Sequence, residues 1–306
     1  MYEEHVRIGT LVKVNAQTLR YLQEIIPYGF EAFSLTFTHS LAGIDLPVFA
    51  AQVRETIADS PAVISCISTY ANPLETDAEA EEARETWERL IDAADLFGCD
   101  VVGGFTGRLI DVPVDQQMDR FVEVFDPLAR RAADRGVRIA FENCPKGGNW
   151  FTGGWNIAHS PLAWEMIFNS LPMENIGLQW EPCHQMLKLI DPIPQLRKWA
   201  KKIFNVHGKD ATILWDVIRE YGIDSPKPFA YHRTPGFGDC NWTDVISILR
   251  QSGYCGSIDI EGWHDPVYVG ELEMMGQVRS LQYLQACRGG SFVPNPALRR
   301  DTVTMR

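Results

Sequence analysis

The sequence lacks the marks of several protein classes. Its seven cysteines, which form no Cys-x-x-Cys pair, stand at 66, 99, 144, 183, 240, 255 and 287. Their odd number and scattered positions argue against a disulfide framework or a thiolate zinc site, so we expect reduced thiols that mostly fill the core. No apolar run approaches the span of a bilayer, and the N-terminus shows no basic segment followed by a long apolar run. We therefore expect a cytoplasmic protein without a membrane partner.

Positive charge is scarce. Lys and Arg number 28 against 40 Asp and Glu, which gives a formal net charge of -12. Binding to a phosphate backbone relies on clustered cations that release counterions, so this balance disfavours a nucleic-acid partner. The hydrophobic fraction of 45% is that of an ordinary globular protein, which excludes disorder and leaves ample material for a large core.

No linker rich in Gly, Ser or Pro divides the chain, and short apolar runs alternate with amphipathic helical segments throughout. The strand candidates are 6–10, 32–37, 62–68, 100–105, 137–142, 176–181, 202–207 and 257–261. The helix candidates are 16–28, 46–58, 78–97, 116–135, 161–170, 194–201, 243–252 and 272–286.

Eight alternating units predict an α/β fold, a single (β/α)8 TIM barrel. A doubly wound sheet would more often have fewer strands and a glycine-rich first turn, which residues 10–14 do not provide. We assign 1–287 to the barrel and 288–306 to an irregular C-terminal extension. Residues 211–232 form an insertion with a helical patch at 215–219, and such a loop is typical of a lid or specificity element.

Polar residues end four consecutive strand candidates. They are Glu142, Glu181, His207 and Glu261. The active site of such a barrel lies at the C-terminal ends of its strands, so three carboxylates and one imidazole should converge there. Carboxylates left unpaired at this distance would repel one another, and a divalent cation is the simplest partner.

The donor set decides which metals suit the predicted centre. Three oxygen donors and one nitrogen suit one Mn²⁺, Mg²⁺, Co²⁺ or Zn²⁺ ion, with Mn²⁺ preferred, and exclude a structural thiolate site. A single Glu at a strand end is more often a solvated or salt-bridged residue, so the prediction depends on the joint occurrence. His184, three residues after Glu181, fits either a helix-capping or core histidine or a group at the same mouth.

Five segments, in order, resemble the xylose-isomerase-like sugar phosphate isomerase/epimerase superfamily over residues 6–286. They are Phe141-Glu142-Asn143, Trp180-Glu181-Pro182-Cys183-His184, Val206-His207-Gly208-Lys209-Asp210, Arg233 to Asp239 with Trp242, and Ile260-Glu261. Each segment is weak alone, and the ordered set is specific.

The resemblance implies a metal bound by Glu142, Glu181, His207 and Glu261, and a substrate held by His184, Lys209 and Arg233. Glu142 and Glu261 would then be the catalytic pair. One departure is that the family usually has Asp where this chain has Glu181, which leaves the identity of the metal open. Lys209 also fits a plain surface lysine, and Arg233 a residue that orders its own loop.

The expected function is that of a metal-dependent isomerase or epimerase of a sugar, sugar phosphate or related polyol. One carboxylate would remove a proton from the carbon next to a carbonyl, which leaves an enediolate, and a second carboxylate would return a proton to it. The alternative is a dehydratase or eliminase acting on a keto-inositol or a 3-keto-glycoside. An apurinic-endonuclease-like nuclease and a non-catalytic sugar-binding barrel are disfavoured, and a homo-oligomer is left open.

Aromatic residues near the expected strand ends suggest, as a group, stacking against a sugar ring. They are Phe37, Tyr70, Trp150, Trp155, Trp180 and Trp263.

Overall fold

The computed structural model describes residues 6–38, 40–290 and 293, and it confirms the predicted TIM barrel. Eight parallel strands close in the order β1-β10-β7-β6-β5-β4-β3-β2. Their bounds are β1 Arg7–Lys13, β2 Ala32–Phe37, β3 Val63–Thr69, β4 Val101–Gly104, β5 Arg138–Glu142, β6 Ile176–Trp180, β7 Ile203–Gly208 and β10 Ser257–Ile260.

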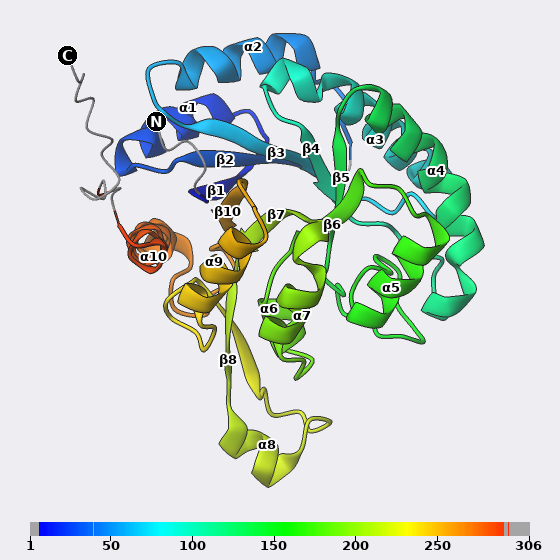
Figure 1. The fold of residues 1–306 in the computed structure, drawn as a ribbon, viewed down its shortest axis with the longest axis vertical. Coiled ribbons are helices and arrows are strands. Elements are labelled where there is room, and N and C mark those ends of the chain that lie inside the picture. The colour runs from blue at the N-terminus through cyan, green and yellow to red at the C-terminus, as the bar shows by residue number, and fades with distance from the viewer. Residues whose placement is uncertain (1–5, 39, 291–292, 294–306) are drawn as a thin grey trace, which may run out of the picture.

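Helices form a layer around the outside of the barrel (Figure 1). The longer ones are α1 Thr18–Ile25, α2 Leu46–Ile57, α3 Ala78–Phe97, α4 Met118–Asp134, α5 Pro161–Ser170, α7 Pro192–Trp199, α9 Trp242–Gln251 and α10 Glu273–Arg288. Short segments are α6 Cys183–Met186 and the 3₁₀ turns Ile26–Tyr28, Val114–Gln116, Ala200–Lys202 and Gly270–Leu272. Several helices begin where an Asp or Ser side chain accepts a backbone N–H, as Asp77 does from Ala80.

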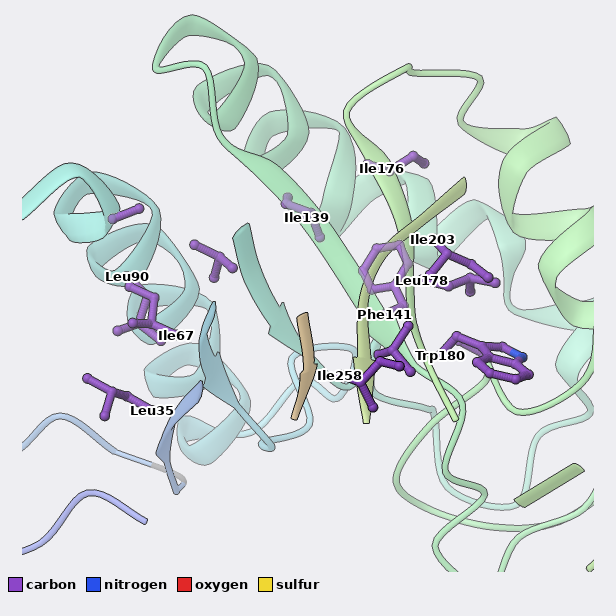
Figure 2. Packing of buried hydrophobic residues seen from close by; sticks show 14 of the residues in the cluster. Leu35, Ile67, Leu90, Ile139, Phe141, Ile176, Leu178, Trp180, Ile203 and Ile258 are labelled. Carbon is purple, nitrogen blue, oxygen red and sulfur yellow. The ribbon is translucent and has the colours of Figure 1, made fainter. Parts of the chain in front are cut away.

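Alternation along the strands divides apolar from polar side chains. Ile139 and Phe141 of β5 face outward into the hydrophobic core, as do Leu178 and Trp180 of β6 (Figure 2). Because successive residues of a strand point to opposite faces, Glu142 points into the barrel, and so does Glu181, which directly follows β6. The same alternation puts His207 and Glu261 on the inner side, since Val206 and Ile260 belong to the outer core.

The inside of the barrel is polar and hydrogen-bonded. Tyr70 donates to Oε1 of Gln179 at 3.1 Å, and Nε2 of Gln179 donates to Oδ1 of Asn205 at 2.9 Å. Nδ2 of Asn205 in turn donates to Oδ2 of Asp259 at 2.8 Å. Gly103 leaves room for the side chain of Gln179, because a Cβ at residue 103 would lie 2.7 Å from Nε2 of Gln179. These bonds give Gln179 and Asn205 partners below the mouth.

The insertion at 211–232 is a hairpin arm, which the sequence analysis predicted only in its helical part. Its strands, β8 Asp210–Ile213 and β9 Ala230–Arg233, pair antiparallel outside the barrel, with α8 Trp215–Tyr221 between them. Figure 1 shows the arm projecting away from the barrel. Its root is held by Asp210, whose carboxylate accepts from Nε1 of Trp242 at 2.9 Å and from the backbone of Cys240 at 3.0 Å.

The predicted extension at 288–306 lies mostly outside the described residues, and its first residue, Arg288, is the last of α10. Within the described residues, no helix is long and apolar enough to cross a membrane.

The packing beneath the site can be tested at Phe125 on α4. Its ring lies 4.9 Å from that of Phe141 and 5.6 Å from that of Trp87, measured between centroids. Phe125→Ala should lower the free energy of unfolding by about 3–5 kcal/mol because it leaves a cavity between α3, α4 and β5. Val48→Ala, at a side chain on α2 that is 54% exposed, is the control, with an expected change within about 0.5 kcal/mol. Equal urea midpoints for the two variants would contradict this account.

Candidate metal centre

Three of the expected side chains meet at the C-terminal end of the barrel. Ligand atoms of Glu142, His207 and Glu261 all lie within 4.8 Å of one another. Nδ1 of His207 is 3.5 Å from Oε2 of Glu261 and 3.8 Å from Oε1 of Glu142. Each of the three side chains is at least nine-tenths buried. Alternation on β5, β7 and β10 thus delivers two carboxylates and an imidazole to one point.

Glu181, the fourth expected ligand, lies beside this group. Its Oε1 is 2.6 Å from Nε2 of His184, and its Oε2 is 3.9 Å from Nζ of Lys209. Nζ of Lys209 also donates to Oε1 of Glu261 at 2.7 Å. Lys209 therefore bridges two of the three carboxylates, and it is buried with them.

Within the part of the chain that the structure describes, several buried atoms of the site have no hydrogen-bond partner. They are both carboxylate oxygens of Glu181, Oε2 of Glu261, both ring nitrogens of His207 and Nε2 of His184. Buried polar groups are nearly always satisfied, and each exception calls for an explanation. Oxygen and imidazole donors left open at one point are what a divalent cation requires, so the residues fit a bound ion such as Mn²⁺.

Electrostatics separate the carboxyl groups. Burial raises the pKa of Glu142 to about 7, although the charge of His207 opposes the shift. Burial likewise raises the pKa of Glu181 to about 7, against the charge of Lys209. Burial also acts to raise the pKa of Glu261, but Lys209 and His207 outweigh it and hold that pKa well below its usual value.

The two basic groups are held in their charged forms. Burial acts to lower the pKa of His207, but the neighbouring carboxylates of Glu261 and Glu142 outweigh it and raise the pKa to about 9. Burial also opposes the charge of Lys209, and Glu181 and Glu261 raise its pKa well above the usual value. Before an ion binds, a proton on His207 and the ammonium of Lys209 partly neutralise the carboxylates.

A cavity of about 680 Å³ opens above these residues, at the mouth of the barrel. Glu142, His184, His207, Lys209 and Glu261 all line it. Such a volume suits a small molecule, and the site lies at the end of the barrel where TIM-barrel active sites are found.

Arg233 is placed differently from the other expected residues. It ends β9 at the root of the arm, and its Nε donates to Oδ2 of Asp265 at 3.0 Å. It is not among the residues that line the cavity. A role in holding substrate stays a prediction for Arg233, and the observed contact joins the root of the arm to the loop after β10.

Of the aromatic group, Tyr70 and Trp263 line the cavity, whereas Phe37 and Trp180 are buried in the core. Trp263 also carries Nζ of Lys13 over its ring, 4.2 Å from the centroid. The sequence analysis missed Lys13, which is the last residue of β1 and was open to the same strand-end rule. It also missed Cys144, Lys146 and Lys188, which lie on the loop after β5 and on the turn after α6.

Comparison with known proteins agrees with this architecture. Residues 22–287 match the family described as xylose isomerase-like TIM barrel. The chain belongs to this family. Its barrel is also similar to a xylose isomerase domain protein from Planctomyces limnophilus, with a TM-score of 0.70 and 20% identity over 93% of this chain and 98% of that one. It is similar as well to a 3-keto-D-glucoside 4-epimerase from E. coli, with a TM-score of 0.69 and 15% identity over 92% of this chain and 100% of that one.

One curated relative is similar in sequence. Inosose dehydratase from Clostridium tetani (strain Massachusetts / E88) is 29% identical over 118 residues, which are 36% of this chain. The match spans 37% of the length of that relative. The structural likenesses, at 20% identity or less, show the shared fold.

The ligand assignment predicts how metal is lost. Protein purified without chelator should hold close to one equivalent of divalent metal, and Glu142→Gln or His207→Ala should reduce this sharply, because each removes a donor from the buried set. Glu165→Gln, on the exposed face of α5, is the matched control and should keep the metal. Full occupancy by elemental analysis in both site variants would mean that the ligands lie elsewhere.

The pKa values also predict how metal binding depends on pH. An ion must displace the proton of His207, whose pKa is about 9, and that of Glu142, whose pKa is about 7. The affinity for Mn²⁺ should therefore rise from about pH 6 to about pH 9, with protons released on binding. Titration calorimetry in buffers of different ionisation enthalpy measures both quantities. A flat profile over this range would contradict the placement of these two groups at the ion.

Proposed function

We propose that this protein is a divalent-metal-dependent enzyme that moves a proton next to the carbonyl of a sugar or related polyol, as an isomerase or epimerase. The observation that carries the proposal is the buried group of Glu142, His207 and Glu261 beneath a 680 Å³ cavity. The family and the 3-keto-D-glucoside 4-epimerase fold neighbour support it.

The proximity of the two carboxylates supports proton exchange at one carbon. Glu142 and Glu261 come from different strands, β5 and β10, and both approach Nδ1 of His207, within 3.8 Å and 3.5 Å. A substrate carbon above this point would have one carboxylate to take its proton and another to return one. A bound divalent ion would supply polarisation of the carbonyl, which acidifies the neighbouring C–H.

The unequal environments of the carboxyl groups suit the two roles. The pKa of Glu142 is raised to about 7 by burial, so it can carry a proton near neutral pH, while the pKa of Glu261 is held well below its usual value. Paired groups whose pKa values are pushed apart are typical of acid and base partners. Lys209 keeps Glu261 ionised and offers a cation to an oxygen that gains negative charge.

The second candidate is a dehydratase of a keto-polyol. It is favoured by the match to inosose dehydratase, which covers 36% of this chain. Proton removal next to a carbonyl can end in loss of a β leaving group, and the same side chains would begin either reaction. Product identity therefore separates the two candidates.

Exchange with solvent tests the reaction class. Metal-loaded protein is incubated in deuterated water with a broad panel of ketoses, keto-inositols and 3-keto-glycosides. The substrate should gain deuterium at the carbon next to its carbonyl. Glu261→Gln should abolish the label, since it removes one carboxylate of the pair, and Glu165→Gln should retain it. NMR detects both the label and the product.

The products then decide between the candidates. An isomer or epimer supports the first, and an unsaturated compound supports the dehydratase. Absence of both label and product from the whole panel would remove the support for a proton-transfer enzyme, and product without label would indicate a hydride shift.

A further inference from the structure

A second group of metal donors shares the cavity with the first. Ligand atoms of Glu142, Cys144 and His184 lie within 4.8 Å of one another, and all three residues line the cavity. We propose that these three side chains form a second, thiophilic metal site, which takes Zn²⁺ or Cd²⁺ and excludes the ion held by Glu142, His207 and Glu261.

The backbone that carries two of these donors is held in place. Glu142 ends β5, and Cys144 follows two residues later on the adjoining loop. The amide of Asn156 donates to both of their carbonyl oxygens, at 2.7 Å and 2.9 Å. Asn143, between them, bonds through its side chain to the backbone of Glu181 at 2.9 Å and 2.7 Å. The carboxylate and the thiol are therefore presented together as a fixed pair.

The third donor, His184, has one ring nitrogen, Nε2, without a hydrogen-bond partner among the described residues. It stands on α6, directly beyond the neighbouring strand β6, and only 7% of it is exposed. Its Nε2 forms a close ion-pair contact with Oε1 of Glu181 at 2.6 Å, but among the described residues neither atom has a partner in hydrogen-bond geometry. A buried imidazole nitrogen without a hydrogen bond, in a cavity that also holds a carboxylate and a thiol, is a ready ligand.

The chemistry of the donors gives this site a different preference from the first. Sulfur and imidazole donors select Zn²⁺ and Cd²⁺, whereas carboxylate oxygens suit Mn²⁺ and Mg²⁺. When an ion binds Cys144, the thiol proton passes to solvent. Glu142 belongs to both groups of donors. An ion bound at Cys144 would therefore remove Glu142 as a ligand for an ion at His207 and Glu261. The site would therefore make the enzyme sensitive to inhibition by thiophilic metals.

Cadmium absorption tests the site without any assay of activity. One equivalent of Cd²⁺ should give the wild-type protein an ultraviolet thiolate-to-cadmium charge-transfer band, and Cys144→Ser should lack it. Cys255→Ser removes an exposed cysteine and should keep the band. A band that persists in Cys144→Ser overturns the proposal. Its loss only in Cys183→Ser would place the ion instead at Cys183, whose Sγ lies 3.3 Å from Nδ1 of His232.

A second variant guards against a folding defect. Circular dichroism should show Cys144→Ser folded like the wild type. His184→Gln keeps the thiol and should weaken Cd²⁺ binding by about tenfold or more, because it removes a ligand. Unchanged affinity in His184→Gln would rule out the three-donor site.

Competition between the ions tests the role of the shared carboxylate. In Mn²⁺-loaded wild-type protein, about one equivalent of Cd²⁺ should release Mn²⁺, seen as the free-ion signal in electron paramagnetic resonance. Cys144→Ser should need about tenfold more Cd²⁺, since one donor is missing. Identical release curves would overturn the exclusion. If the wild type binds no Mn²⁺ at all, the proposed function fails, while the absorption result still decides the thiol site.

Discussion

Burial of three carboxylates in one cavity is the constraint on which the site depends. Glu142, Glu181 and Glu261 are each at most 6% exposed, and water cannot screen their repulsion. The chain answers with two buried bases, His207 and Lys209, and Lys209 contacts both Glu181 and Glu261. Atoms that remain without hydrogen bonds mark where this compensation is incomplete. A bound divalent cation would offset that deficit of positive charge. The unequal contacts of the carboxyl groups with Lys209 and His207 also separate their pKa values.

Strand alternation explains why much of this could be predicted from the sequence. Each of Glu142, Glu181, His207 and Glu261 ends or follows a short apolar run, and a parallel barrel brings strand ends to one rim. The rule gives direction but no distance. It could not separate Glu181 from the tighter group, because that difference depends on contacts of its side chain with His184 and Lys209.

Features that depend on loops and local pairing escaped prediction. The arm strands Asp210–Ile213 and Ala230–Arg233 are four residues each and only partly buried, so neither shows a clear apolar pattern. Arg233 finds Asp265, 32 residues away, which no spacing in the sequence reveals. The sequence suggests an ordinary core thiol at Cys144, and it does not reveal that Asn156, from a later loop, bonds the backbone carbonyl of Cys144.

The arm also bears on how such a barrel can diverge. No residue of α8 is buried, so substitutions there leave the barrel core untouched. The two ends of the arm nevertheless lie beside the candidate metal centre, because Lys209 directly precedes β8 and His232 belongs to β9, and both line the cavity. Asp210 anchors the root through Trp242 and Cys240, whatever lies beyond it. The outer arm can therefore vary in sequence and length while the residues at its root keep their places beside the cavity.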